Sequence, residues 1–385
     1  MKTSIAIIFV SIVLLVYSSV NYYIFIRGYQ SIPEGKNYRI IYTSIFLILA
    51  TSFVIGRFGM YFLPEKLSTI FIRVGSFWMA FMLYFFLLVL VFDIIKGVHH
   101  FTNFLPSVIT DSMLKTKQIL FIISVISIGL LVLGGHINAL NPRIKKLNLN
   151  IEKNIEGRSN LQIALISDLH LGYVIDRKYL AKVVKKINNL DPDIVLLAGD
   201  MLDEDIKPVL SKNMGKEFLK LKAPLGVIGI TGNHEYIGNA EKSCKYLEDC
   251  GVKILRDSSV LVDNSFYIIG REDRDKKRYS KTDRQNINAL SEHLDKSKAL
   301  IMLDHQPYDF DEKENAGIDL SLHGHTHHGQ MWPLSFITKA IFKLSWGHLQ
   351  QGKSHFYTSS GVGGWGPRVR IGNRPEIVFI ELTFN

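Results

Sequence analysis

Four histidines fall within six residues in the stretch 321–330, which reads Ser-Leu-His-Gly-His-Thr-His-His-Gly-Gln. Imidazole is the commonest protein ligand for transition metals, and alternate residues that leave a strand can converge on one point. The apolar run 318–322 just before the histidines predicts a short buried strand. A histidine-rich run alone also fits a solvated loop. The metal interpretation therefore depends on other segments that end in the same way.

Four more apolar runs lead directly into polar segments. They are residues 162–167 before Asp168-Leu169-His170, 194–198 before Gly199-Asp200, 227–231 before Gly232-Asn233-His234-Glu235, and 299–303 before Asp304-His305. Amphipathic helices predicted over 178–190 and 239–250 lie between them. This alternation predicts an α/β domain with a largely parallel sheet, in which ligands bind beyond the carboxyl ends of the strands. Five strands that each deliver Asp, Asn or His to that edge would build one site.

The residue types in these segments suit a pair of metal ions. The side chains of Asp168 and His170 leave the strand on the same side, so they can hold one metal. Asp200 has two carboxylate oxygens and can bridge two cations, and the glycine that precedes it permits a tight turn. Two metals about 3.5–4 Å apart can activate a bridging water and clamp phosphoryl oxygens. The mixed nitrogen and oxygen ligands suit two divalent ions among Mn, Fe, Zn and Ni.

In this order, the segments resemble the calcineurin-like metallophosphoesterase family, of the membrane-anchored bacterial type. The motifs that carry the resemblance are Asp168-x-His170, Gly199-Asp200, Gly232-Asn233-His234-Glu235, His305 and Gly324-His325-Thr326-His327. They cover most of residues 160–385. The resemblance implies a two-sheet β-sandwich flanked by helices, with a binuclear metal centre.

The resemblance also implies a role for each motif residue. The first metal would be bound by Asp168, His170 and His327, the second by Asn233, His305 and His325, with Asp200 bridging them. His234 would contact the phosphate and protonate the leaving group, because an expelled alkoxide needs a proton.

Residues around the motifs complete the expected site. Glu235 and Gln330 are expected to orient ligands by hydrogen bonding. Arg368 and Arg370, in a Gly- and Arg-rich tail, are candidate phosphate contacts. Two further histidines, His323 and His328, stand where relatives carry smaller residues, and we expect them beside the ligands or in solvent.

Two flanking segments allow alternative interpretations. The charge run 271–284 predicts a solvated loop, with the lining of an anionic substrate's approach as the alternative. Residues 332–350 predict an amphipathic helix whose apolar stripe suits either the protein core or a bilayer surface, and we favour the core. Cys244 and Cys250 are too few for a disulfide framework and are expected to be reduced thiols.

The first third of the chain is far more apolar than the rest. Runs at 4–26, 40–56, 74–92 and 118–135 are each close to the roughly 20 residues that a helix needs to cross a bilayer. The net charge of +10 fits an anionic partner, and these runs favour the bilayer over a specific nucleic acid. We predict a four-helix transmembrane anchor over 1–140, a basic linker over 141–158 and a metallophosphoesterase domain over 159–385.

An even number of spans places both termini on the same side of the membrane. Lys and Arg are enriched on cytoplasmic flanks. The flanks on the side of the termini hold Lys2, Arg57, Lys66, Arg73, Arg143, Lys145, Lys146, Lys153 and Arg158, and the other flanks hold Arg27, Lys36, Arg39, Lys96, Lys115 and Lys117. This excess favours a cytoplasmic catalytic domain anchored in the bacterial inner membrane.

These features predict a membrane-anchored, binuclear-metal-dependent phosphoesterase. It would cleave a phosphodiester or pyrophosphate bond in a lipid-linked substrate, by attack of a metal-activated water, with Asp200 between the metals and His234 as general acid. A nuclease or cyclic-nucleotide phosphodiesterase could use the same centre. A metal-binding membrane sensor or transporter without catalysis is the third possibility, although it would have no use for a general acid.

Overall fold

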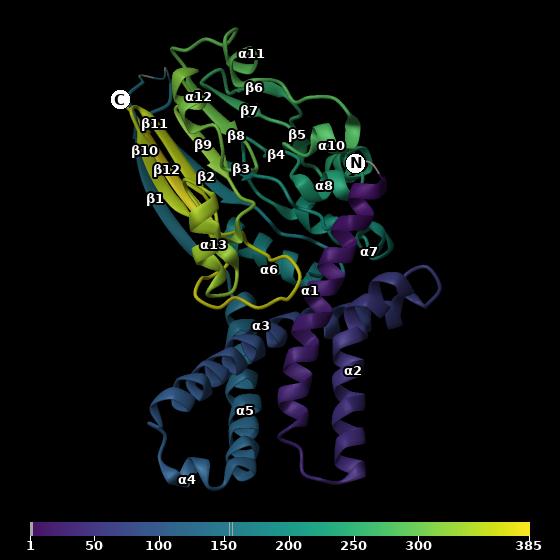
Figure 1. Cartoon of the computed structure of the whole chain (residues 1–385). Coiled ribbons are helices and arrows are strands. Elements are labelled where there is room, and N and C mark those ends of the chain that lie inside the picture. Colours follow the sequence, from purple (N-terminus) through teal and green to yellow (C-terminus); the bar gives the residue numbers. More distant parts are fainter. Residues whose placement is uncertain (1–2, 154, 156) are drawn as a thin grey trace. The chain divides into compact units, whose positions relative to one another are not determined.

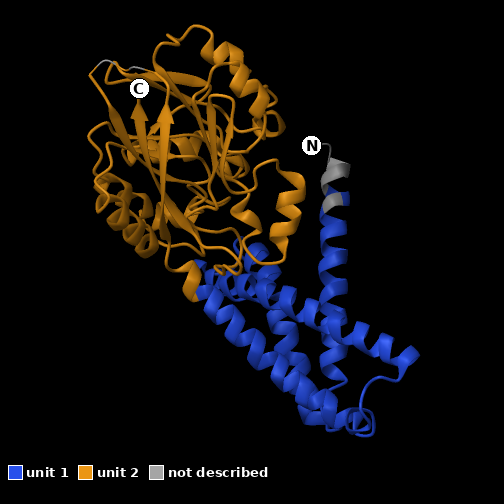
Figure 2. Cartoon of the chain, turned by 90° about the vertical axis from the view of Figure 1, so that its left-hand side faces the viewer, with its two compact units in different colours: residues 1–136 blue, residues 137–385 orange. Residues whose placement is uncertain are grey.

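The computed structural model describes the chain apart from residues 1–2, 154 and 156. The chain divides into two compact units, Met1–His136 and Ile137–Asn385 (Figure 2). The first unit is helical, with α1 (Thr3–Tyr29), α2 (Lys36–Gly59), α3 (Glu65–Thr102), α4 (Ser107–Thr110) and α5 (Met113–Ala139). Within the described residues, four of these helices are long and apolar enough to cross a membrane, namely all but α4. The prediction of four transmembrane helices is confirmed.

Polar groups inside the first unit are paired with one another. The indole Nε1 of Trp78 donates to Asn21 Oδ1 over 2.8 Å, and both side chains are buried. Arg27 near the end of α1 forms a 2.7 Å ion pair with Asp93 of α3. Pairing lowers the cost of holding such groups among apolar helices.

The second unit contains two six-stranded sheets that pack face to face (Figure 1). The first sheet has the order β1 (Arg143–Ile151), β12 (Glu376–Phe384), β2 (Asn160–Ile166), β3 (Ile194–Leu197), β4 (Val227–Gly229) and β5 (Lys253–Ile254). The second has the order β10 (Gly347–Gln351), β11 (Ser354–Thr358), β9 (Leu320–His323), β8 (Ala299–Leu303), β7 (Phe266–Gly270) and β6 (Ser258–Val262). The two-sheet sandwich is confirmed. The five predicted ligand-bearing strands are divided between the two sheets, and where they pair with one another they are parallel, as expected.

The second unit also has helices between its strands. They are α6 (Arg177–Asn188), α7 (Lys207–Ser211), η1 (Met214–Lys220), α8 (Asn233–Gly238), α9 (Ala240–Asp249), α10 (Lys276–Ser280), α11 (Ile287–Ser291), α12 (Phe310–Asn315), η2 (His327–Gly329) and α13 (Leu334–Ile341). Ile163 of β2 and Ile301 of β8 share the central core between the sheets. Val183 of α6 packs on Val195 of β3 in a second cluster, and α11 packs on β8 in a third. Apolar side chains on both faces explain why β3 and β8 read as continuous apolar runs.

The basic linker expected over residues 141–158 is wrong for Arg143–Ile151, which form β1. This strand pairs in parallel with β12 in a nine-residue register from Arg143–Glu376 to Ile151–Phe384. Lys146, Asn148 and Asn150 are exposed on one face, while Leu149 and Ile151 are buried on the other. Lys146, Asn148 and Asn150, which contributed to the linker prediction, are on the solvent-facing side of an edge strand.

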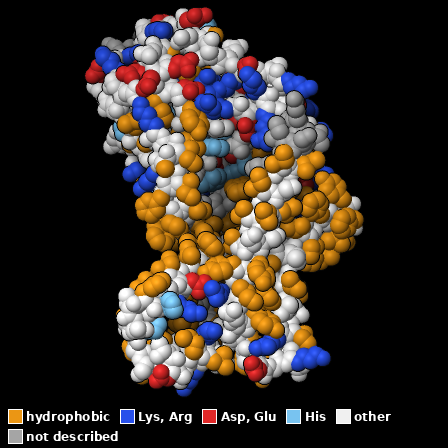
Figure 3. Space-filling model, in the orientation of Figure 1, with side chains coloured by type: hydrophobic (Ala, Val, Ile, Leu, Met, Phe, Trp, Pro, Cys, Tyr) orange, Lys and Arg blue, Asp and Glu red, His pale blue; other side chains and the backbone are white. Residues whose placement is uncertain are grey.

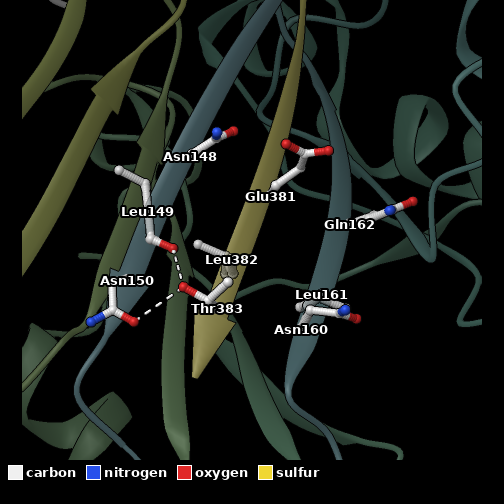
Figure 4. Close-up of a pocket in the computed structure, with 9 residues that line it drawn as sticks. All are labelled: Asn148, Leu149, Asn150, Asn160, Leu161, Gln162, Glu381, Leu382 and Thr383. Atoms are coloured by element: carbon white, nitrogen blue, oxygen red, sulfur yellow. Dashed lines mark hydrogen bonds between the residues drawn. The ribbon is translucent and has the colours of Figure 1, made fainter. Parts of the chain in front are cut away.

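A shallow pocket lies on the polar face of β1, β12 and β2 (Figure 4). Thr383 Oγ1 donates to the carbonyl oxygen of Leu149 over 3.3 Å and lies 3.1 Å from Asn150 Oδ1. The other polar side chains that line it are Asn148, Asn160, Gln162 and Glu381. One carboxylate among neutral amides offers little to a metal or a nucleophile, so this pocket is not a candidate for phosphoester chemistry.

Candidate metal centre

The strand ends of the two sheets bring the predicted motif residues together. Strands β2, β3 and β4 are parallel and end beside one another, and β8 and β9 do the same in the second sheet. Asp168, His170 and Asp200 follow β2 and β3 with φ of 54°, 52° and 55°. This left-handed backbone is rare for residues other than glycine and is found at sites where the surrounding structure fixes an unusual turn. It lets consecutive motif side chains turn toward one point.

Glycines allow the two sheets to meet at this point. Gly199 has a φ of +85°, and a Cβ on it would lie 2.7 Å from Nδ1 of His305 in the opposite sheet. A Cβ on Gly232 would overlap the Asp200 carboxylate, and one on Gly324 would overlap Oδ2 of Asp168. The glycines are therefore required by close approach, as their place in the motifs indicated.

The residues expected for the first metal form one compact group. Ligand atoms of Asp168, His170 and His327 all lie within 4.8 Å of one another. The two Nε2 atoms of His170 and His327 are 3.1 Å apart, and His327 Nε2 lies 3.5 Å from Asp168 Oδ1. Burial lowers the pKa of both histidines well below the usual value, with a further contribution from His234 at His170 and from Arg370 at His327. Neutral imidazole is the form that binds a metal.

The residues expected for the second metal form an adjoining group. Ligand atoms of Asp200, His305 and His325 lie within 4.8 Å of one another. His305 Nε2 is 3.2 Å from Asp200 Oδ2, and His325 Nδ1 is 2.9 Å from Oδ1 of Asn233. Asp200 Oδ2 also lies 3.7 Å from Nε2 of His170 in the first group. Asp200 thus stands between the two groups, where a bridging ligand is expected.

His234 lies beside both groups without belonging to the expected ligand set. Its backbone N–H donates to Asp200 Oδ1 over 2.9 Å, and its Nδ1 lies 3.1 Å from Asp203 Oδ1. The imidazole rings of His234 and His170 meet edge to face at 4.4 Å. Burial lowers the pKa of His234, but the carboxylates of Asp200 and Asp203 outweigh this effect and raise it to about 9. These carboxylates therefore favour the protonated form of the His234 imidazole.

Glu235 fixes the turns that carry the ligands. Its buried carboxylate accepts hydrogen bonds from the backbone amides of Asp200 (3.0 Å), Leu202 (2.9 Å) and Gly232 (2.7 Å). It therefore ties the segment after β3 to the segment after β4. Burial and the neighbouring Asp200 raise the pKa of Glu235 to about 7.

The described residues fit a pair of divalent cations. Burial and the nearby Asp200 raise the pKa of Asp168, whose Oδ2 is buried without a hydrogen-bond partner. Within the described part of the chain, the ion-pair partners of Asp168 and Asp200 are histidines only. Buried carboxylates without a lysine or arginine are costly unless a cation is coordinated. The donor set and this charge imbalance both suit metal ions.

Comparison with known proteins identifies the family. Residues 161–329 match the calcineurin-like phosphoesterase family model. An uncharacterised metallophosphoesterase of Aquifex aeolicus is 30% identical over 252 residues, which cover 64% of this chain and 94% of that protein. The chain belongs to the calcineurin-like metallophosphoesterase family. An uncharacterised metallophosphoesterase of Campylobacter jejuni is 29% identical over 387 aligned residues, which cover 97% of this chain and 98% of that protein.

The chain is also similar to an animal protein that is described as a transmembrane protein. A protein of Danio rerio described as a transmembrane protein with metallophosphoesterase domain is 27% identical over 282 residues, covering 68% of this chain and 62% of that one. Together with the four apolar helices, this likeness indicates a membrane protein with a metallophosphoesterase domain.

Two of the expected supporting residues hold loops of this metallophosphoesterase domain in place. Gln330 Nε2 donates to the carbonyl oxygens of Trp365 (3.0 Å) and Pro367 (2.7 Å), and its Oε1 accepts from Trp365 N over 3.1 Å. Arg370 is buried and donates to the carbonyl oxygens of Gly363 (2.7 Å) and His327 (3.0 Å). Both side chains bind backbone rather than presenting polar groups to a substrate.

The two arginines predicted to contact phosphate, Arg368 and Arg370, each have partners within the domain. Arg370 directs its donors to carbonyl groups because it is buried beneath the His327 loop. The guanidinium of Arg368 lies over the ring of Tyr179, 4.2 Å from its centroid. No local pattern in the sequence indicates these partners, since they come from distant segments.

His323 and His328 lie outside both ligand groups. His323 is buried, with Nδ1 2.6 Å from the carbonyl oxygen of Asp304 and Nε2 3.0 Å from Ser321 Oγ. His328 has Nδ1 3.0 Å from Ser345 Oγ. Their position beside ligand-bearing segments agrees with the expectation that they support the site, and it excludes solvent for His323.

The charge run 271–284 is exposed over much of its length, including residues 277–283, as expected for a solvated loop, but its first three residues, 271–273, are buried. Arg271 and Arg284 bind Asp304 over 3.3 and 2.9 Å and Asp309 over 3.0 and 2.9 Å. Lys313 binds Asp304 over 2.9 Å, with both side chains fully buried. Although burial opposes ionisation, Lys313 and the two arginines hold the pKa of Asp304 far below its usual value. This ionic network lies directly before His305 in the chain.

Asp203 is the functional candidate that sequence reasoning missed. It follows Asp200 by three residues, on the exit from β3, and its carboxylate reaches His234. Its ligand atom also lies within 4.8 Å of those of His170 and His234. An acidic residue shortly after Gly199-Asp200 was visible, but nothing in the spacing showed that it turns back toward His234.

Proposed function

We propose that this protein is a membrane-anchored phosphoesterase that uses two divalent metal ions to hydrolyse a phosphodiester or pyrophosphate bond in a lipid-linked substrate. The observation that carries the proposal is the pair of adjoining ligand groups, with Asp200 of the second group 3.7 Å from His170 of the first. Family membership supports metal-dependent phosphoester hydrolysis. The four apolar helices and the family likeness to transmembrane proteins support the membrane-borne substrate.

We assign the first metal to Asp168, His170 and His327, the second to Asn233, His305 and His325, and the bridge to Asp200. When bound, such a pair of ions activates water and neutralises charge on the phosphoryl oxygens. The role of the chain is to hold the ligands in place, through Glu235 and the glycine turns.

We assign the general acid to His234. Its Nδ1 is engaged by Asp203, which orients the ring and stabilises the imidazolium. Its other nitrogen is then the atom that can donate a proton to a leaving oxygen. A metal-binding sensor without catalysis would not need this dyad, so the His234–Asp203 contact favours the enzyme.

We further propose that the catalytic unit lies on the cytoplasmic face of a bacterial inner membrane. The support is the excess of Lys and Arg on the flanks that share a side with the C-terminal domain. A nuclease or cyclic-nucleotide phosphodiesterase using the same centre is the alternative for the substrate.

The test uses the full chain in lipid nanodiscs, after chelation and re-addition of Mn²⁺. Hydrolysis is followed on bis-p-nitrophenyl phosphate, on cyclic nucleotides, and on vesicle-borne lipid diesters and lipid pyrophosphates. We expect metal-dependent turnover that Asp200→Asn abolishes on every substrate, with the highest kcat/KM on a lipid. Higher kcat/KM on cyclic nucleotides would assign the alternative substrate.

The His234→Ala variant tests the assigned acid. A p-nitrophenolate leaves without a proton, whereas an alkoxide does not, so the variant should lose more activity on an alkyl ester than on the nitrophenyl ester. Equal losses on both would contradict the assignment of His234. A folded chain that binds no metal would contradict the whole proposal.

A further inference from the structure

An exposed apolar surface lies on α13 and the residue before its N-cap. Trp332, Phe336, Ile337 and Ile341, which we call the α13 surface, have exposed fractions of 51%, 62%, 57% and 58%. The spacing puts them on one side of the helix, and no residue of α13 is buried. The expectation that the apolar stripe of residues 332–350 packs in the core is therefore wrong for Phe336, Ile337 and Ile341. Hydrophobic side chains gather over α13 on the face that Figure 3 shows, with histidines nearby.

The α13 surface is joined to the metal-ligand loop. The start of α13 packs on Gly329, where a Cβ would overlap the Leu334 backbone, two residues after His327. Thr326 Oγ1 donates to the carbonyl oxygen of Ser345 over 2.6 Å, and Ser345 Oγ donates to Thr338 of α13 over 2.9 Å. Any surface that holds α13 therefore also holds the segment that carries His325 and His327.

Aromatic residues continue from α13 around the ligands. The ring of Phe342, directly after α13, meets that of His325 edge to face at 5.8 Å. On the other side, the Trp365 ring lies 6.4 Å from His234 and is 54% exposed. Trp365 is held by Gln330, the third residue after His327. Two of the proposed catalytic and ligand histidines thus have an aromatic neighbour, and one of these neighbours, Phe342, directly follows α13.

The same surface adjoins the end of α5 within the second unit. Asn138, in the last turn of α5, donates to the carbonyl oxygens of Arg370 (2.8 Å) and Asn373 (2.7 Å). Trp332 N donates to the carbonyl oxygen of Ile371, between them, over 2.8 Å. The segment 370–373 therefore has the end of a candidate membrane span on one side and Trp332 on the other.

These contacts identify the bilayer as the occupant of the α13 surface. Contiguous exposed apolar side chains beside a membrane-spanning segment mark an interaction site. Trp is enriched at membrane interfaces, and exposed Lys339 beside the apolar residues suits anionic headgroups. Because α5 already tethers the domain, docking does not incur the cost of bringing two free molecules together. A second copy of the chain would lack this advantage.

We infer that the α13 surface inserts into the interface of the bilayer that α5 spans, and that it sets the metal centre at the depth of lipid phosphate. The docking stands on the contacts above, whereas the delivery of a lipid phosphate rests on the proposed function. The two parts are tested by different measurements.

Docking is tested by nitroxide labels on the full chain in nanodiscs that hold one copy each. Phe336→Cys and Ile337→Cys are labelled in a background without Cys244 and Cys250, both of which are buried. Leu219→Cys, at an apolar side chain that is 59% exposed on η1, is the matched control. We expect labels at 336 and 337 to be shielded from a water-soluble nickel complex and accessible to oxygen, and the label at 219 to behave oppositely. Equal nickel accessibility at all three positions would overturn the inference, as would shielding that appears only in discs that hold two copies of the chain.

Delivery is tested by Phe336→Asp with Ile337→Asp, compared with Leu219→Asp. We expect the double variant to lose about tenfold in turnover of a vesicle-borne lipid ester and to stay within about twofold on bis-p-nitrophenyl phosphate. Equal losses on both substrates would overturn the delivery claim. If the unaltered protein hydrolyses neither, the proposed function fails, while the label measurement still decides docking.

Discussion

The carboxylate of Asp203 lies 3.1 Å from Nδ1 of His234, so the residue proposed to protonate the leaving group has an acidic partner. Against the opposing effect of burial, the carboxylates of Asp200, Asp203 and Glu204 raise the pKa of His234 to about 9. Asp200 is proposed to bind both metals, and metal ions would offset its charge. Asp203 is thus left as the nearest acidic group that can sustain the imidazolium during turnover.

As the pH is raised, the Asp203→Asn variant should begin to lose activity at a lower pH than the unaltered protein does. A general acid works while it is protonated, and loss of a neighbouring carboxylate lowers the pKa of His234. The alkaline fall of kcat should therefore begin at lower pH. The measurement is the pH dependence of kcat at saturating Mn²⁺, with an alkyl phosphoester whose leaving group needs a proton.

The control for this prediction is Asp205→Asn, which removes the same charge two residues away. Asp205 accepts a hydrogen bond from the hydroxyl of Tyr173 over 3.1 Å. The control should leave the alkaline limb unchanged. Equal shifts in both variants would point to long-range charge instead of the contact with His234, and no shift in either would exclude His234 as the titrating group.

Glu235→Gln should destabilise the catalytic unit and weaken metal binding. An amide nitrogen cannot accept a hydrogen bond, so at least one of the backbone donors of Asp200, Leu202 and Gly232 loses its partner. An unsatisfied buried donor costs about 1–3 kcal/mol. For a domain of this size each kcal/mol lowers the unfolding temperature by about 2–4 °C.

Thermal unfolding and equilibrium Mn²⁺ binding of the chain in detergent would measure both effects. Glu248→Gln, at an exposed position of α9, is the matched control and should change neither. An unchanged Mn²⁺ affinity in Glu235→Gln would show that the carboxylate does not position Asp200.

Gly232→Ala should abolish binding of the second metal. The added methyl would overlap the carboxylate of Asp200 and lie 2.6 Å from its backbone nitrogen, so the proposed bridging ligand must move. Metal content by elemental analysis should fall from two ions toward one or none. Gly134→Ala, at a helical glycine with nothing within 4 Å of the new Cβ, should keep the full metal content. Two bound metals in Gly232→Ala would show that the approach of Asp200 does not require a glycine at this position.

The sequence predicts the ligand-bearing strand ends well because each couples an apolar run to polar residues within a few positions. Strand β1 was mistaken for a linker because its solvent-facing residues, including Lys146 and Asn148, are polar, and because its partner β12 lies at the far end of the chain. Such long-range pairing leaves no local signal. The division of the strands into two sheets has the same origin.

The ion-pair partners of individual charged residues could not be predicted from the sequence either. Arg271 and Arg284 read as part of a solvated run because Asp304 and Asp309, which bind them, come from other segments. The stripe on α13 was visible, but amphipathicity does not say whether its apolar side meets a core or a membrane. That choice depended on the exposure of Phe336 and Ile337 in the folded chain.

Substitutions in the buried ionic network around Asp304, directly before His305, should lower the free energy of unfolding by different amounts. Asp304→Asn leaves the buried ammonium of Lys313 with the carbonyl oxygen of Tyr308, 2.9 Å away, in place of a carboxylate. Breaking a buried pair in this way costs about 3–5 kcal/mol. Lys313→Met should cost less, because Arg271 and Arg284 still compensate Asp304. Lys343→Met, which removes an exposed pair with Asp311, should cost less than about 1 kcal/mol.

The double variant Asp304→Asn with Lys313→Met separates a charge effect from a packing effect. If the cost of Asp304→Asn comes from an uncompensated ammonium, removal of that ammonium should restore part of the lost stability. If it comes from disturbed packing around β8, the two losses should add. The measurement is denaturant unfolding of the unaltered protein, the two single variants and the double variant, which together form a double-mutant cycle. Recovery in the double variant, with Mn²⁺ affinity still reduced, would show that the charge of Asp304 also helps to hold His305 in its place beside Asp200.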